Sequence, residues 1–257
     1  MSQLPRLKHF VAGTEDGPWI TFVPGIGNDA EFWRHHAEVL AADHRTLRFE
    51  PWGCGRSGPA PENCTIEEVA AGIRQLWDEV GIERSSVVGL GFGGSAALCL
   101  ALRHPDRVDR VVACCCRPRQ PDDRRTFWRR RQAFAREYGM TATAEVTVDR
   151  WLRPAFRKAH PEVVEVLRAA MGRMTVEGYC AYVDAFLAMD LEDELRKLAV
   201  PTLLVAAEHD HGGGPVDSMN AMAGALDCAH LAVVAGSGHL CSHESPEAMA
   251  DLLRSFL

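Results

Sequence analysis

Three short runs of consecutive apolar residues restrict the fold of this chain more than any other feature. They read VVG at 87–89, VVACC at 111–115 and TLLVAA at 202–207. Strands that are apolar on successive residues are covered on both faces, as in parallel sheets with helices on either side. Longer amphipathic segments separate the runs, so the sequence predicts an α/β fold with a mostly parallel central sheet flanked by helices. The expected strands are residues 7–12, 19–23, 46–49, 86–89, 108–114, 202–207 and 230–234.

Two helix starts can be identified from the chemistry of their first turns. Thr65 and Glu68 have the spacing of a capping box, in which each side chain accepts a hydrogen bond from the backbone N–H of the other residue. We expect this helix to end at about Val80, because Gly81 follows it. Pro246 stands at the first position of a final helix. Proline is favoured there because a backbone N–H at this position has no intrahelical acceptor, so its absence costs no hydrogen bond.

The segment 117–198 interrupts the alternation of strands and helices. It contains no strand-like run, only helical periodicity with breaks at Pro121, Pro154 and Pro161. We therefore predict a core formed by residues 1–116 and 199–257, with residues 117–198 as a helical lid above the sheet. The first part of this segment has seven arginines in fifteen residues, which favours a solvated helix face. Any of them that turn inward would suit a substrate with a carboxylate.

The charge and the cysteine content of the 257 residues exclude several classes of function. A formal net charge of -7 argues against nucleic acid as the main partner. No stretch approaches the roughly 20 apolar residues of a membrane helix, and the first residues lack the apolar segment of a secretion signal. Nine cysteines, three of them adjacent at 114–116, indicate reduced thiols. The sequence predicts a cytoplasmic protein with a small-molecule substrate and no nucleic-acid or membrane partner, and it leaves the oligomeric state open.

The glycine-rich turn after the strand at 86–89 fits two different motifs. Gly89, Gly91 and Gly94 match G-x-G-x-x-G, the dinucleotide fingerprint. Such a site also requires an acidic residue at the end of the next strand, where this sequence has cysteines followed by Arg117. The same turn matches the nucleophile elbow G-x-S-x-G at every position except one, because Gly91 stands where that motif has its serine. We favour the elbow.

An acid and a histidine follow in the order that the elbow motif requires. Asp210 comes directly after the predicted strand at 202–207, and His239 comes after the one at 230–234. Both are expected at the carboxyl edge of the sheet, where open α/β sheets place their sites. Upstream, a glycine-rich turn follows the strand at 19–23, and its Ile26 N–H is suited to form an oxyanion hole with the N–H of Phe92.

Several segments together carry a resemblance to a known family. They are PWGCGRS, TIEEVAAGIRQLWDEVGIERSSVVGLGFGG, ALRHPDRVDRVV, RWLRPAFRKAHPEVVEVLRAAM, PTLLVAAEHD and GHLCSHESPEAM. In them the chain resembles the α/β-hydrolase family, most closely the 3-oxoadipate enol-lactonases. The resemblance implies the α/β-hydrolase fold with a helical lid, a serine in the family at position 91, the acid at Asp210, the base at His239 and oxyanion donors at Ile26 and Phe92. It also implies that Trp128 and Arg131 line the substrate pocket.

The leading hypothesis is an enzyme that acts on a small lactone or enol-ester-like carbonyl compound without a cofactor. Because Gly91 has no hydroxyl, the acyl-enzyme route is closed. Ser95 lies one helical turn further on, and nothing in the sequence places Cys54 near His239, so neither is a good replacement. Asp210 and His239 still form an oriented general base, which could activate a water in the space of the missing hydroxyl.

Two alternatives to hydrolysis stay open. One is a proton-transfer enzyme on the same scaffold, such as an isomerase, lyase or decarboxylase. The other is a catalytically silent binding protein or an engineered serine-to-glycine variant. A metal site is not expected, since the ligand-capable groups near the acid and the histidine match no zinc motif. These groups are Glu208, His209, Asp210, His211, His239, Cys241 and His243.

Overall fold

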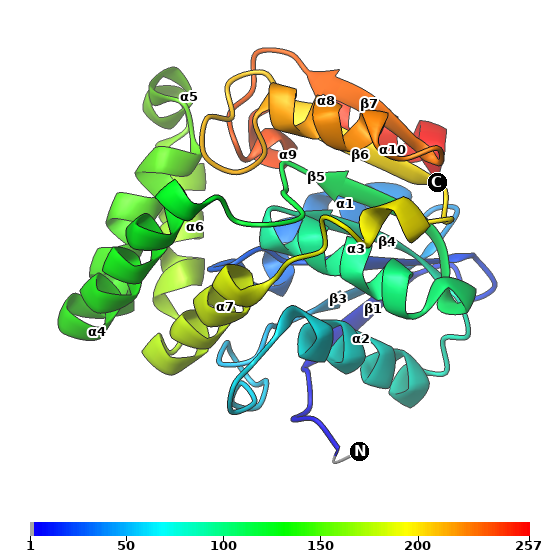
Figure 1. Cartoon of the computed structure of the whole chain (residues 1–257), viewed down its shortest axis with the longest axis horizontal. Helices are drawn as coiled ribbons and strands as arrows, with labels where there is room; N and C mark the ends of the chain where they lie inside the picture. Colours follow the sequence, from blue (N-terminus) through cyan, green and yellow to red (C-terminus); the bar gives the residue numbers. More distant parts are fainter. Residues whose placement is uncertain (1–2) are drawn as a thin grey trace.

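The computed structural model describes residues 3–257 and shows the alternation of strands and helices that the sequence predicts (Figure 1). The strands are β1 (His9–Gly13), β2 (Trp19–Val23), β3 (Arg45–Phe49), β4 (Ser85–Leu90), β5 (Val108–Cys114), β6 (Thr202–Ala207) and β7 (Ala229–Val234). The helices are α1 (Arg34–Leu40), α2 (Ile66–Val80), α3 (Phe92–Arg103), α4 (Asp122–Trp151), α5 (Pro154–Ala159), α6 (Pro161–Gly172), α7 (Val176–Ala188), α8 (Val216–Gly224), α9 (Cys241–Glu244) and α10 (Pro246–Phe256). All seven predicted strands are present.

The strands form one sheet in the order β1-β3-β2-β4-β5-β6-β7. Only β1 is antiparallel to its neighbour β3, and the other pairs are parallel. The prediction of a mostly parallel sheet is therefore confirmed. Because parallel strands end at the same edge, the turns after β2, β4, β5, β6 and β7 meet there.

Two hydrophobic layers cover the two faces of the sheet, as the continuous apolar runs predict. In β4, Val87 packs into the layer shared with α2 and α3, whereas Val88 packs into the layer shared with α1 and α10. All these strand positions are buried, and burying a Val side chain contributes about 1.5–3 kcal/mol. The central strands are thereby held rigidly, and they fix the turns at their carboxyl ends.

The helix signals in the sequence are confirmed. The Thr65 hydroxyl accepts a hydrogen bond from the Glu68 N–H at 3.2 Å, and the Glu68 carboxylate accepts one from the Thr65 N–H at 3.0 Å. Gly81 ends α2 in the left-handed conformation, with φ 82°. Pro246 is the first residue of α10.

Helices α4–α7 are inserted between β5 and β6 and lie together beside the sheet (Figure 1). Pro121 caps α4, and Pro154 and Pro161 begin α5 and α6, in keeping with the predicted breaks. Helix α4 is kinked at Gly139, whose φ of 77° and ψ of 177° are not helical.

The division into a core and a lid at residues 117 and 198 stays a prediction, and residues 1–2 of that core lie outside the described part of the chain. Within residues 3–257, none of the helices combines the length and the apolarity that crossing a bilayer requires.

Candidate active site

A cavity of about 760 Å³ lies between the carboxyl edge of the sheet and helices α4 and α7. The turns after the parallel strands supply one wall, and α4, its following loop and Phe186 of α7 supply the other. Arg131, which the family resemblance places in the pocket, is not among the lining residues. The other predicted site residues all line the cavity: Ile26, Gly91, Phe92, Trp128, Asp210 and His239.

Gly91 forms the sharp turn between β4 and α3. Its φ of 59° and ψ of -123° lie where a residue with a Cβ is strained. A Cβ at this position would be 3.4 Å from Nε2 and 3.6 Å from Cε1 of His239, and no other heavy atom of residues 3–257 beyond the adjacent residues would lie within 4 Å. The turn therefore directs the missing side chain at the imidazole of His239.

His239 is oriented by Asp210, as the order of motifs predicts. Nδ1 of His239 lies 2.9 Å from Oδ2 of Asp210. Oδ1 also accepts hydrogen bonds from the N–H groups of Gly212 at 2.9 Å and Gly213 at 2.8 Å, and Oδ2 accepts one from the Gly214 N–H at 2.8 Å. An ionised carboxylate only accepts, so Nδ1 carries the proton and Nε2, on the Gly91 side, is free to take one.

The Asp210 carboxyl is ionised although it is buried. Burial by itself opposes ionisation, but the attraction to His239, its hydrogen bond and those from Gly213 and Gly214 outweigh burial. Together they hold the pKa of the Asp210 carboxyl well below its usual range. A buried carboxylate thus orients the His239 imidazole, which is the arrangement of an oriented general base.

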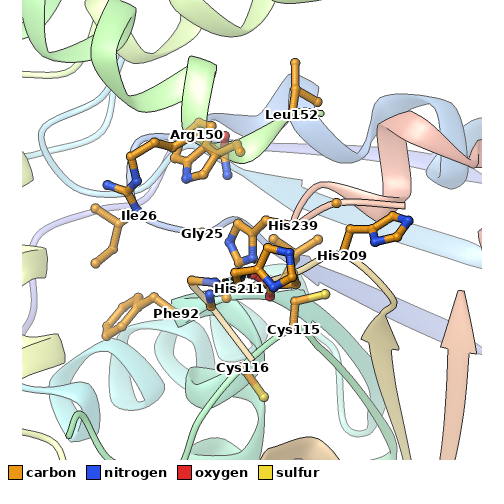
Figure 2. Close-up of a pocket in the computed structure, with 18 of the residues that line it drawn as sticks. Gly25, Ile26, Phe92, Cys115, Cys116, Arg150, Leu152, His209, His211 and His239 are labelled. Atoms are coloured by element: carbon orange, nitrogen blue, oxygen red, sulfur yellow. Dashed lines mark hydrogen bonds and ion pairs between the residues drawn. The ribbon is translucent and has the colours of Figure 1, made fainter. Parts of the chain in front are cut away.

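Ile26 and Phe92 line the same cavity as His239 (Figure 2). Phe92 is the first residue of α3, where a helix leaves its N–H groups without intrahelical partners. Within residues 3–257, neither the Ile26 N–H nor the Phe92 N–H has a hydrogen-bond acceptor. Both are available to a carbonyl oxygen bound in the cavity, and the positive end of the α3 dipole favours negative charge there.

Comparison with known proteins agrees with this architecture. A model described as "Alpha/beta hydrolase family" matches residues 22–252. The chain belongs to the alpha/beta hydrolase family. This confirms the family that the sequence motifs indicate.

Two solved structures and one curated protein illustrate what this alpha/beta hydrolase resembles. The 3-oxoadipate enol-lactonase 2 of Acinetobacter baylyi is 24% identical over 246 residues, which cover 94% of this chain and 89% of that protein. The enol-lactonase of Burkholderia xenovorans LB400 has a TM-score of 0.93 at 27% identity, with 98% of this chain and 96% of that one covered. A thermophilic esterase of Thermogutta terrifontis has a TM-score of 0.90 at 27% identity, with coverages of 97% and 92%.

Neither of the two alternative nucleophiles considered from the sequence is placed to act in this alpha/beta hydrolase. Ser95 is buried, and its hydroxyl donates a hydrogen bond to the carbonyl of Arg117 at 2.7 Å. Cys54 is buried and does not line the cavity. Burial, with the charges of Asp29 and Glu50 adding to it, raises the pKa of the Cys54 thiol to about 12.

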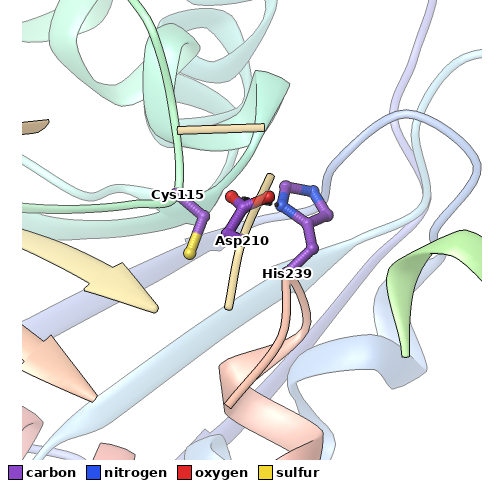
Figure 3. A group of neighbouring side chains, drawn as sticks. All are labelled: Cys115, Asp210 and His239. Atoms are coloured by element: carbon purple, nitrogen blue, oxygen red, sulfur yellow. Dashed lines mark hydrogen bonds and ion pairs between the residues drawn. The ribbon is translucent and has the colours of Figure 1, made fainter. Parts of the chain in front are cut away.

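One group of side chains has the spacing of metal ligands, and it includes a residue that the sequence did not indicate. Ligand atoms of Cys115, Asp210 and His239 lie within 4.8 Å of one another (Figure 3). The Asp210 oxygens, however, already accept four N–H groups. A hydrogen bond with Cys241 and burial raise the pKa of the Cys115 thiol well above its usual value. A trio whose carboxylate lone pairs are occupied and whose thiol stays protonated fits a metal ion poorly.

Two arginines of the arginine-rich segment hold the loop that carries Asp210. Arg117 donates from Nε to the Gly213 carbonyl at 2.5 Å, and Arg124 donates from Nη2 to the His211 carbonyl at 2.7 Å. Both line the cavity. Arg129 agrees with the prediction of a solvated helix face, because it pairs with the partly exposed Asp184 at 2.5 Å. The segment therefore supports the loop that carries Asp210 from one side and meets solvent on the other.

Arg150 lines the cavity, whereas Arg131, which the family resemblance places there, does not. Arg131 is buried within the helical insertion, where its guanidinium donates to the Thr147 hydroxyl and to the Thr143 carbonyl at 3.3 Å. Arg150, which no motif indicated, lines the cavity, and its guanidinium carbon is 4.3 Å from the centre of the Phe127 ring (Figure 2).

Arg150 keeps an unsatisfied positive charge in the cavity. It has no hydrogen-bond acceptor or carboxylate partner among residues 3–257. The adjacent carboxylate in the sequence, Asp149, pairs instead with Arg157 and Arg168. Burial, with the charges of Arg131 and Arg124 adding to it, lowers the pKa of Arg150 to about 10. A guanidinium that still carries its proton at neutral pH, and that lacks a protein partner, is suited to bind an anion.

Proposed function

We propose that this alpha/beta hydrolase acts on a small lactone or enol-ester-like carbonyl compound, with His239 and Asp210 as the general base and a water in place of a serine nucleophile. The observation that carries the proposal is the space at Gly91. A Cβ there would be 3.4 Å from Nε2 of His239 and would touch nothing else outside its chain neighbours. A water molecule fits between the imidazole and a carbonyl carbon bound above the turn.

The steps follow from the positions of the groups. Nε2 of His239 takes a proton from the water as the water oxygen attacks the carbonyl carbon, and Asp210 stabilises the imidazolium that results. The N–H groups of Ile26 and Phe92 hold the oxyanion, and His239 then returns the proton to the leaving oxygen. A general base contributes about 10²–10⁴-fold to the rate. One oxyanion donor contributes about 10²–10³-fold.

The walls of the cavity favour a substrate with an apolar body and an anionic end. Trp128 packs edge-on against Phe186 with ring centres 5.2 Å apart, and both line the cavity. Arg150 supplies a cation without a protein partner. Two similar proteins are enol-lactonases, and the structure of the similar esterase has malate bound, which supports a carboxylate-bearing lactone or ester. We assign the substrate contact to Trp128 and Arg150, and give Arg131 the role of shaping the helical lid at 117–198.

A second function uses the same groups without hydrolysis. With no side chain at position 91, Nε2 of His239 faces the cavity directly and could move a proton on the carbon skeleton of a substrate whose enolate the oxyanion hole holds.

The free cysteines, none of which is bonded to another in the described chain, support the cytoplasmic location that we propose for either activity.

One experiment separates these functions. The protein is incubated with a panel of lactones and esters, with and without a carboxylate, in H₂¹⁸O and separately in D₂O. From lactones and esters whose leaving oxygen is not an enol oxygen, we expect one ¹⁸O atom in each acid product and no deuterium on its carbon atoms. Enol-lactones are left out of the D₂O arm, because a released enol takes a solvent deuteron on carbon when it becomes the ketone. Deuterium on carbon without ¹⁸O would instead establish proton transfer. If no compound is turned over and the variant His239→Ala binds the panel as the unaltered protein does, the chain is a binding protein.

A further inference from the structure

The position that a side chain would occupy at Gly91 is open on every side except one. Of the described atoms outside the adjacent residues, only Nε2 and Cε1 of His239 would lie within 4 Å of a Cβ there. The remaining surroundings belong to the cavity of about 760 Å³. The imidazole of His239 is therefore the side chain that meets a molecule at this position, and the open cavity leaves room there for a nucleophile other than water.

We propose that this position is a subsite for small neutral nucleophiles, so that the enzyme transfers the acyl group of its substrate to hydroxylamine or small alcohols as well as to water. This rests on the general-base role proposed above for His239. It goes beyond hydrolysis because the attacking molecule is a second substrate with its own place in the site.

The transfer step balances without an oxidant or a further reagent. The lone pair on the nitrogen or oxygen of the nucleophile forms a bond to the carbonyl carbon, and the π electron pair moves to the carbonyl oxygen at the Ile26 and Phe92 N–H groups. His239 takes the proton that the nucleophile releases. When the carbonyl re-forms, the bond from carbon to the leaving oxygen breaks, and the imidazolium gives its proton to that oxygen. The products are an acyl derivative of the nucleophile and an alcohol or enol.

The charge of the cavity selects among nucleophiles. Arg117, Arg124 and Arg150 line it, and Arg153, which also lines it, pairs with Glu244. Of its two carboxylates, Asp149 pairs with Arg157 and Arg168, and Asp210 is buried and already satisfied by His239 and the loop N–H groups. An ammonium ion entering the cavity meets like charge and has no lone pair to offer. Hydroxylamine is largely neutral at pH 8, whereas methylamine is largely protonated, so hydroxylamine should be the better acceptor.

A glycine and a serine at position 91 give different kinetics with an added nucleophile. In the unaltered chain the added nucleophile attacks the substrate itself, so release of the leaving group accelerates as its concentration rises. In Gly91→Ser the serine attacks first, and the added nucleophile acts only on the acyl-enzyme, after the leaving group has gone. Leaving-group release should then be independent of hydroxylamine while acylation limits the rate.

The test uses 4-nitrophenyl acetate at pH 8 with increasing hydroxylamine, and each rate is corrected for the reaction without protein. Nitrophenolate release is followed by absorbance and the hydroxamate by mass spectrometry. We expect release to rise at least threefold and to saturate in hydroxylamine, with hydroxamate as the main product. Methylamine and the bulkier N-tert-butylhydroxylamine should give at least tenfold less acyl transfer, a comparison that needs no variant.

The outcomes distinguish this inference from the hydrolytic function. Nitrophenolate release that yields acid but no hydroxamate above the blank overturns the subsite and leaves hydrolysis intact. Release that requires hydroxylamine supports the subsite and overturns hydrolysis. No release under either condition overturns both. The variant Gly91→Ala should form hydroxamate at least tenfold more slowly, because its methyl group takes the place of the nucleophile. Its melting temperature shows whether it folds. A folded variant that retains the full rate of hydroxamate formation contradicts the proposal.

Discussion

The backbone of Gly213 lies directly against the imidazole of His239. A Cβ at residue 213 would be 2.2 Å from Cε1 and 2.4 Å from Nδ1 of His239, and 2.8 Å from Oδ2 of Asp210. These distances are below any real contact, so only glycine permits the observed hydrogen bond between the two side chains. Because the Gly213 N–H also donates to Asp210 and Arg117 donates to the Gly213 carbonyl, this residue positions the base from both ends.

Replacing Gly213 with alanine should therefore displace the imidazole. We expect Gly213→Ala to lower kcat by about 10²–10⁴-fold, the contribution of a general base, with a much smaller change in KM. The measurement is steady-state kinetics on the best substrate of the panel. The matched control is Gly224→Ala in α8, where a Cβ would meet nothing within 4 Å, and it should leave kcat unchanged. Equal kcat values for the two variants would contradict the positioning role of Gly213.

Removing the carboxylate of the pair should have a similar effect for a different reason. In Asp210→Asn the amide no longer fixes the proton on Nδ1 of His239, and kcat should fall by about 10²–10⁴-fold. His209→Ala, which also alters the cavity wall but does not touch the pair, should change kcat less than threefold. A normal kcat for Asp210→Asn, with the fold intact by circular dichroism, would rule out the general-base mechanism.

Arg150 should determine the preference for an anionic substrate. A hydrogen bond to a charged group is worth about 1.5–3 kcal/mol, so Arg150→Gln should lower kcat/KM for mono-4-nitrophenyl succinate by about 10–100-fold. The neutral 4-nitrophenyl butyrate should be affected less than threefold. Arg136→Gln, an exposed position on the same helix, serves as the control and should alter neither value. A uniform loss for both esters in Arg150→Gln would mean that Arg150 acts on structure and not on substrate charge.

His36 should make the fold sensitive to acid. Its side chain is buried on α1, both ring nitrogens lack a partner among residues 3–257, and its aromatic neighbour is Trp33. The pKa of His36 is lowered from 6.5 to about 3, mainly by burial. The charges of His35 on α1 and His243 on α9 add to this lowering of the pKa, whereas the Pro246 backbone on α10 opposes it.

The sign of the pH dependence follows from that shift. Between pH 6.5 and about 3 the unfolded chain binds a proton at His36 that the folded chain does not. The free energy of unfolding should thus fall by up to about 1.4 kcal/mol per pH unit as the pH decreases through this window. Urea unfolding of His36→Leu should show a smaller slope, whereas His230→Leu, on the exposed edge of β7, should retain it. Parallel stability curves for the two variants would contradict this prediction.

The sheet and the catalytic pair could be predicted from the sequence because their signals are local. Continuous apolar runs locate the buried strands, and parallel strands bring Asp210 and His239 to one edge without any knowledge of side-chain contacts. The cavity wall formed by α4 could not be predicted in this way. Periodicity places Arg131 and Arg150 on a helix, but the kink at Gly139 lies between them, so the helical period does not relate the face of one to the face of the other. Cys115 likewise comes beside Asp210 only because β5 and β6 are neighbours.

The turn between β4 and α3 keeps a backbone shape that glycine does not require. With φ 59° and ψ -123°, Gly91 retains the conformation in which a side chain would point at His239, and a substituent there would add strain of about 1–3 kcal/mol. A glycine codon and a serine codon can differ by one base. If Gly91 is encoded by GGT or GGC, one base change gives serine, and its hydroxyl would then face the His239 imidazole.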